Sequence, residues 1–401
     1  MVEFDDTYKE SDAVSALRKK NILYFAVATA FIGFAFATVE NIISNYYDSF
    51  GISSIQRGWL EFPRELPGML LIFISGILFF LGSSKMGVIA GLLGVTGLLG
   101  LGFLTPSYNV MIIWLFIFNT GTHIWMPVKA EIGMSLAKDG KTGSQLGRFD
   151  MIYTFAGLVG GSLIYLGFRR FSFNYTITFV ICSASLLLAV LFLSRLKLGK
   201  PVEKQKMKLV FKKRYTLYYI MCIFNGARKQ ISITFVPWLL IRIFDRTADN
   251  MLLIGMASTA LGIVVYPMIG AAIDKFGEKT VLASEAFVLA LACTAYIFVK
   301  NTSSVILYVV IAGCVLDRML VYAGNARSTY IKKIAENQDD VLPTISTGIS
   351  LDHLISMTIP ALGGYVWQMF GYQYVFVGAF FIAIVNFILA TKIRSEKAPD
   401  R

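Results

Sequence analysis

The sequence predicts an all-helical integral membrane protein with twelve transmembrane helices arranged as two pseudo-symmetric six-helix halves. Three observations predict it: an apolar composition, twelve long apolar runs, and a basic segment after the sixth run. Apolar residues make up 56% of the 401 positions and charged residues 15%, with a mean hydropathy of +0.65. A soluble domain carries roughly a quarter charged residues, so water is not the main solvent of this chain.

Each apolar run is long enough for one helical crossing, since a bilayer core of about 30 Å needs roughly 20 residues. Backbone polar groups cannot stay unpaired in lipid, and the runs are far too long for barrel strands, so we expect helices. The first run is also too long for the apolar core of a signal peptide. The runs are residues 22–46, 58–82, 86–104, 109–135, 149–167, 173–194, 215–243, 249–272, 280–299, 304–330, 344–368 and 373–392.

The basic residues between the runs predict the orientation. With a cytoplasmic N-terminus, 25 of them fall in inner segments and 6 in outer segments. This asymmetry places both termini in the cytoplasm of a multi-pass protein of the cell inner membrane. It also explains much of the net charge of +12, so no nucleic-acid partner is required.

The domain organisation follows from the same count. We expect a cytoplasmic tail (1–21), a first bundle (22–194), a cytoplasmic linker (195–214), a second bundle (215–392) and a second tail (393–401). The linker holds nine basic residues, which favours a topogenic role and leaves contact with anionic lipid as the alternative. Such a pair of bundles is typical of transporters built from repeats.

One loop motif carries a family resemblance. The stretch "GAAIDKFGEKTVL" (270–282) after the eighth run resembles the G-x-x-x-D-[RK]-x-G-[RK] loop of the major facilitator superfamily, with Glu278 as an insertion. The corresponding loop of the first half keeps only Lys85 and Gly87. The stretches "AGLVGG" (156–161) and "IPALGG" (359–364) end in glycine pairs that allow helices to approach closely. The resemblance implies alternating access around a central cavity lined by the first, fourth, seventh and tenth helices.

Charged residues inside the runs are candidates for function, because a lysine or arginine at a helix centre costs about 2.5–3.5 kcal/mol. The four helices that the resemblance assigns to the cavity hold most of them, whereas we expect the third, fifth, sixth, eighth, ninth and twelfth helices to lack a comparable mid-span charge. The charged and histidine residues of these four helices are Glu40, His123, Lys129, Glu131, Arg228, Lys229, Asp317 and Arg318.

Polar stripes on two of these helices predict the substrate contacts. Asn225, Arg228 and Ser232 share one face of the seventh helix, where the planar fork of Arg228 suits a carboxylate or phosphate. The alternative is that Arg228 only neutralises Asp317, and Lys229 is expected to pair with an acid across the bundle. The remaining predicted contacts are Arg318, Tyr322 and Asn325 on one face of the tenth helix, and His123 on the fourth, for which a hydrogen-bonded packing role is an equal alternative.

Acidic residues supply the predicted coupling and gating groups. Glu40 is the main candidate for proton binding, with Asp317 and Glu131 as further candidates. A salt bridge from Glu40 to the start of the second helix, where "EFPREL" (61–66) lies, is an equal alternative for that residue. By family analogy, Asp274 and Lys275 are expected to close the cytoplasmic gate near Arg148. Asp352 and His353 lie near the inner end of the eleventh run and are expected to form a gate-side pair, with a binding site as the alternative.

Together these features predict a secondary active transporter of a small polar solute, anionic or zwitterionic, coupled to protons. A sodium-coupled sugar carrier is the main alternative. A drug or lipid exporter is disfavoured because Gly157 replaces the proline of the pattern in drug/proton antiporters. We find no enzyme signature and only two histidines, so we expect no metal and no cofactor. The sequence gives no sign of an oligomer, so we expect a monomer. A receptor on a transporter fold stays open as an alternative.

Overall fold

The computed structural model describes residues 12–78, 81–138, 141–198, 211–299 and 303–393, and within these ranges the chain is helical without strands. The all-helical class is therefore confirmed. Parts of the predicted linker and of both tails lie outside the described residues. The α-helices are α1 (Asp12–Asp48), α2 (Ser54–Trp59), α3 (Glu61–Leu78), α4 (Gly82–Phe103), α5 (Tyr108–Ser135), α6 (Thr142–Arg170), α7 (Tyr175–Leu193), α8 (Thr216–Arg242), α9 (Ala248–Ile297), α10 (Ser304–Leu320), α11 (Asn325–Ile334), α12 (Gln338–Phe370) and α13 (Tyr372–Thr391), with short 3₁₀ turns η2 (Lys213–Tyr215) and η3 (Val321–Gly324).

Eight helices of the described chain are long and apolar enough to cross a membrane. One of them is α9, whose 50 residues turn back at Gly277, so that it supplies two of the twelve predicted crossings. Another combines α10, η3 and α11 into one crossing. The three long helices outside this group, α3, α8 and α12, carry charged residues of the candidate site described below.

The turn at Gly277 is the turn predicted from the loop motif. Its φ of 78° and ψ of 165° lie in a region that only glycine adopts without strain. The neighbouring Glu278 is buried and accepts a hydrogen bond from Lys333 of α11 at 2.9 Å. Glu278, the insertion in the motif, therefore connects this turn to α11 in the tenth crossing.

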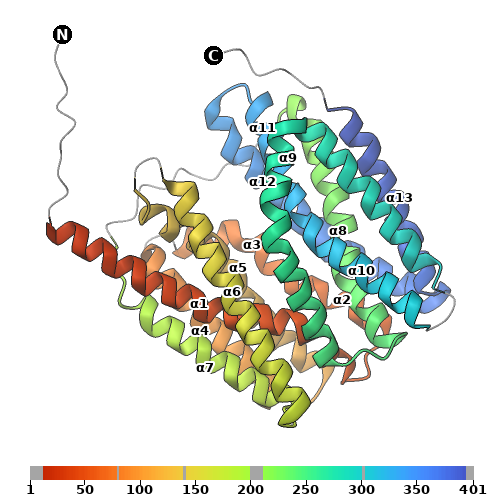
Figure 1. Ribbon diagram of the computed structural model, residues 1–401, viewed down its shortest axis with the longest axis horizontal. Helices are drawn as coiled ribbons and strands as arrows, with labels where there is room; N and C mark the ends of the chain where they lie inside the picture. Colours follow the sequence, from red (N-terminus) through yellow and green to blue (C-terminus); the bar gives the residue numbers. More distant parts are fainter. Residues whose placement is uncertain (1–11, 79–80, 139–140, 199–210, 300–302, 394–401) are drawn as a thin grey trace.

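The helices form two bundles, α1–α7 and α8–α13 (Figure 1). We call the end of the molecule that holds residues 194–198, 211–215 and Gly277 the linker end, and the end that holds residues 49–53, 171–174 and 243–247 the far end. Figure 1 shows the two bundles close together at the far end and spread apart toward the linker end. The two halves are thus in a V-shaped arrangement that is open toward the linker end.

Hydrogen bonds and ion pairs join the two halves at the far end. Arg242 of α8 forms an ion pair with Asp48 of α1 at 2.8 Å and donates to the carbonyl of Ile52 at 2.6 Å. Asn45 donates to the carbonyl of Arg246 at 2.8 Å. These bonds, together with the Arg169–Asp249 pair at 3.5 Å, close the end opposite the linker.

Close backbone approach at Gly364 supports the same closure, and Gly160 shows a similar approach inside the first half. A Cβ at Gly364 of α12 would lie 2.3 Å from the carbonyl oxygen of Ser54, and one at Gly160 of α6 would lie 2.8 Å from that of Phe34. Both glycines belong to the glycine pairs singled out in the sequence. The close approach that we predicted for them is confirmed, within the first half for Gly160 and between the halves for Gly364.

The start of the second crossing differs from the prediction. A capping box between Ser53 and Gln56 begins α2 at Ser54, several residues before the predicted start at 58. Arg57, counted above in an outer loop, is consequently a helical residue with no exposed surface. The outer segments lose one basic residue by this correction, so the asymmetry in basic residues becomes slightly larger.

Candidate functional site

Two adjoining cavities lie along α8. The far-end cavity has a volume of ≈ 250 Å³ and the linker-end cavity one of ≈ 240 Å³. Arg228 and Lys229 line both, so they lie at the level where the cavities meet. The other charged residues that line the far-end cavity are Glu40, Arg64, Asp317 and Arg318, and those of the linker-end cavity are Glu285, Arg327 and Asp352.

The first of the two cations is tightly paired. Arg228 is buried, and its Nη1 lies 2.7 Å from Oδ1 of Asp317 on α10. The hydroxyl of Tyr296 donates to the other oxygen of Asp317 at 3.2 Å. The structure therefore contains the Arg228–Asp317 pair that we gave as the alternative role of Arg228, and it also places Arg228 at both cavities.

The second cation pairs with another helix. Lys229 forms an ion pair with Asp352 of α12, which agrees with the expectation that it would meet an acid across the bundle. The side chain of Lys229 is 23% exposed, against 3% for that of Arg228. Asp352 lies near the middle of α12 rather than near its inner end, so it does not form the predicted gate-side pair with His353.

A buried charge cluster occupies the start of the second crossing. Glu61 accepts hydrogen bonds from Arg57 at 2.6 Å, from Arg64 at 3.0 Å and from Gln230 of α8 at 2.9 Å. Arg64 also forms an ion pair with Glu40 of α1 at 3.2 Å. The salt bridge that we left open for Glu40 is thus present, while 57% of the Glu40 side chain remains exposed.

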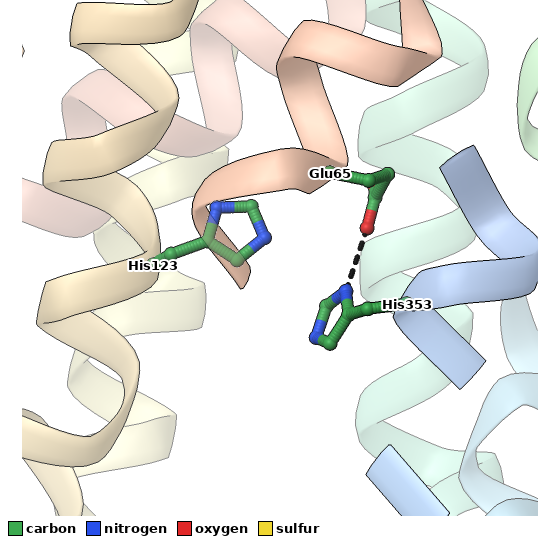
Figure 2. A group of neighbouring side chains, drawn as sticks. All are labelled: Glu65, His123 and His353. Atoms are coloured by element: carbon green, nitrogen blue, oxygen red, sulfur yellow. Dashed lines mark hydrogen bonds and ion pairs between the residues drawn. The ribbon is translucent and has the colours of Figure 1, made fainter. Parts of the chain in front are cut away.

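A second cluster joins the halves nearby. Glu65 of α3 and His353 of α12 form a hydrogen bond of 2.8 Å, and the imidazole of His123 on α5 lies edge-on to that of His353 with ring centroids 5.4 Å apart. Figure 2 shows the two imidazoles converging on the Glu65 carboxylate from opposite halves. His123 therefore belongs to this cluster and is not among the residues that line the two cavities.

The predicted stripe on the tenth crossing is interrupted. Arg318 lines the far-end cavity and donates to Asn41 of α1 at 2.7 Å. The 3₁₀ turn η3 then changes the helical phase, because its residues advance by about 120° instead of 100°. Tyr322 stacks on Tyr266 with ring centroids 3.7 Å apart, and Asn325 is exposed, so neither lines the cavities with Arg318.

The remaining predicted residues lie toward the linker end. Arg148, Asp274 and Lys275 are exposed, and no ion pair joins them in the described part of the chain. Glu131 is partly buried, and its neighbour Lys129 forms an ion pair with Asp150 at 2.6 Å. The predicted gate is therefore not formed in this conformation.

Two features of the site were missed in the sequence. Glu285 is a buried carboxylate in the second part of α9, 3.9 Å from Arg327, so the expectation that the ninth crossing lacks such a charge was wrong. The signal was a lone glutamate inside an apolar run.

The second feature is the end of the linker: Lys212 donates to Asp340 at 2.5 Å, and this hydrogen bond holds the pKa of Asp340 below its ordinary value.

Comparisons with known proteins agree with this architecture. A family model described as Major Facilitator Superfamily matches residues 25–331, more than half of the chain. No curated protein matches the chain. A variant of the nucleoside transporter NupG has a similar fold, with a TM-score of 0.75 and 14% identity over 93% of this chain and 99% of that one.

A second similar structure is a bacterial homologue of the human lysosomal transporter Spinster in an inward-facing and occupied conformation. Its TM-score is 0.70, with 16% identity over 98% of this chain and 100% of that one. At such identities the likeness concerns the fold alone, whereas the family model matches the sequence itself. On these grounds the chain belongs to the Major Facilitator Superfamily.

Proposed function

We propose that this protein is a secondary active transporter that moves a small anionic or zwitterionic organic solute by alternating access. The observation that carries the proposal is the pair of charged cavities that meet at Arg228 and Lys229. Each is a little smaller than the typical range for small-molecule sites, about 300–1,000 Å³. A small metabolite therefore fits this space better than a bulky drug or a lipid.

The charges of the cavities favour a negative group on the solute. Four bases and two acids line the far-end cavity, which leaves an excess of two positive charges. Three bases and two acids line the linker-end cavity. Since Arg228, Ser232 and Arg318 line the far-end cavity and Asn225 the linker-end cavity, we propose these four as the substrate contacts.

The closed far end and the divergent linker end correspond to one end state of alternating access. With both termini in the cytoplasm of the cell inner membrane, as the basic residues predict, this state is inward-open. The opposite state requires the far-end bonds of Arg242 and Asn45 to break while the linker ends approach each other. Glu40 is our candidate for the coupling proton, because its exposed carboxylate reaches the cavity and its protonation would break its ion pair with Arg64, which keeps Glu61 as a partner.

A neutral polar solute is a second candidate, and one observation favours it. Arg228, Lys229 and Arg64 are each paired with an acid, so no lining cation among these three is free to meet an anion without an exchange of partners. NupG, which shares the fold, is described as a nucleoside transporter. Nucleosides and sugars therefore belong in any screen beside carboxylates, phosphates and amino acids.

The test combines binding and flux. Purified protein is heated with each solute class, since a ligand that binds only the folded state raises the unfolding midpoint. The solutes that stabilise it are then offered to proteoliposomes with and without a pH gradient. We expect a carboxylate or phosphate to stabilise the protein and to accumulate with the gradient. Stabilisation by neutral solutes alone contradicts the anion site, and binding without flux in any condition indicates a receptor.

Substitution of Asp274 by asparagine is expected to favour the state described here. We propose that exposed Asp274 meets Arg148 and the start of α6 when the linker end closes, and an exposed pair of this kind is worth up to about 1 kcal/mol. Its loss should change the ratio of the two states by about fivefold. The ratio is read from maleimide labelling of Ser44→Cys in the far-end cavity and of Ser328→Cys in the linker-end cavity.

The labelling is done in a Cys222→Ala, Cys314→Ala background, because Cys222 lines the linker-end cavity and Cys314 lines the far-end cavity. Asp274→Glu keeps the charge and serves as the matched control, with labelling close to that of the parent. Asp274→Asn should lower labelling of position 44 from the far side and raise that of position 328. Unchanged labelling at both positions rules out a gating role for Asp274.

A further inference from the structure

Glu65, His123 and His353 come from three helices and both halves, yet their potential metal-ligating atoms all lie within 4.8 Å of one another. They are the only two histidines of the chain and one carboxylate. The solute cavities described above do not include them among their lining residues. The cluster is thus a separate site between the halves.

The surroundings hold the imidazole of His123 in place. Its Nδ1 lies 2.8 Å from the carbonyl oxygen of Asn119, an acceptor only, so Nδ1 carries the proton and Nε2 keeps its lone pair. In Figure 2 this Nε2 faces the Glu65–His353 pair. A backbone carbonyl behind a histidine is the outer-shell arrangement found at metal-ligating histidines, where it fixes the tautomer and the ring orientation.

Gly68 provides the space for both rings. A Cβ at this position of α3 would lie 2.8 Å from Nε2 of His123 and 2.8 Å from Cε1 of His353. The backbone of α3 is therefore the floor of the cluster, and any side chain there would push the imidazoles away. His123 is buried, which keeps its ring from turning freely into solvent.

We propose that Glu65, His123 and His353 bind a divalent transition-metal ion of the Zn²⁺ type between the two halves. Two imidazoles and one carboxylate are a set of ligands that such ions accept, with a fourth position left for water, whereas Mg²⁺ and Ca²⁺ prefer oxygen ligands. The ion takes the place of the Nδ1 proton in the Glu65–His353 hydrogen bond; that proton moves to Nε2 of a neutral His353, or leaves to solvent when Nε2 already carries one. Zn²⁺ bonds of about 2.0–2.1 Å require the ligand atoms to move to roughly 3.3 Å from one another.

The nearby cations have acidic partners that offset their charge. Arg64, which precedes Glu65, is directed to Glu61 and Glu40, and Lys229 is paired with Asp352. Because His353 lies in one half and the other two ligands lie in the other, a bound ion joins the halves. We therefore expect it to stabilise the folded protein in the arrangement described here.

The experiment is a Co²⁺ titration of the full-length detergent-solubilised protein, purified with a tag that contains no histidine. We expect one Co²⁺ per chain, with visible absorption bands of a nitrogen- and oxygen-ligated ion that vanish when Zn²⁺ is added. Zn²⁺ should also raise the unfolding midpoint of the wild type. His123→Ala, His353→Ala and Glu65→Gln should each weaken Co²⁺ binding at least about tenfold, as loss of even an outer-shell partner does.

Matched variants separate this site from the alternatives. Glu40→Gln removes a carboxylate of the cavity, and Cys222→Ala removes a thiol, so both should bind Co²⁺ like the wild type. Gly68→Ala keeps every ligand but adds the Cβ beneath both rings, and it should weaken binding without removing a ligating group. Absence of saturable binding, or binding that survives the His123→Ala, His353→Ala double variant, overturns the proposal. The readout is independent of transport, so it does not depend on the function proposed above.

Discussion

Glu61→Gln is expected to be the most destabilising single substitution of a charged residue in this protein. Glu61 and Arg57 have no exposed surface, and Glu61 accepts hydrogen bonds from Arg57, Arg64 and Gln230. Loss of the negative charge leaves the cation of Arg57 buried without the anion it pairs with, although the ring of Tyr47 lies 5.3 Å away. Breaking a buried pair in this way costs about 3–5 kcal/mol. Thermal unfolding in detergent measures the loss.

Glu40→Gln is the matched control, because it makes the same chemical change at a carboxylate that is 57% exposed and, among the residues that the structure describes, bonded to Arg64 alone. We expect a loss of no more than about 1 kcal/mol there. Equal losses in the two variants would show that water reaches the Glu61 cluster. The prediction also concerns the contact between the halves, since Gln230 of α8 is one of the three donors to Glu61.

The features that the sequence predicted well depend on local signals. Hydropathy located the apolar runs because each crossing must satisfy its own backbone within the lipid. The turn at Gly277 was predictable because a positive φ requires a glycine. The pairing of Arg228 with Asp317 was foreseen as an alternative because both were unusual charges in helices that line the same cavity.

The features that the sequence did not predict depend on how helices are rotated and aligned against each other. The contact of Glu65 with His353 joins residues 288 positions apart, and nothing in a single sequence records their alignment. Arg57 was assigned to a loop because hydropathy does not register the capping box that begins α2. Tyr322 was assigned to the face of Arg318 because the α-helical period does not reveal the 3₁₀ turn that contains Tyr322.

A charge-free pair at positions 228 and 317 is expected to fold but to lose the anion. Arg228→Met alone leaves Asp317 buried and unpaired, so its defect in binding would be mixed with a defect in folding. Arg228→Met combined with Asp317→Asn removes both charges and keeps an oxygen that can accept from Tyr296. The double variant should regain most of the stability lost in Arg228→Met, because no buried charge remains unpaired.

Binding separates the two roles of Arg228. If its guanidinium holds a carboxylate or phosphate, the double variant loses about 1.5–3 kcal/mol of binding free energy, which weakens affinity roughly ten- to a hundredfold. Lys229→Met with Asp352→Asn is the matched pair on the same helix and should lose less, since an ammonium lacks the planar fork. Solute titrations followed by thermal unfolding compare the wild type with the two double variants. Undiminished affinity in the Arg228 pair would make Arg228 a counter-ion of Asp317 and assign the anion to Lys229 or Arg318, both of which line the far-end cavity.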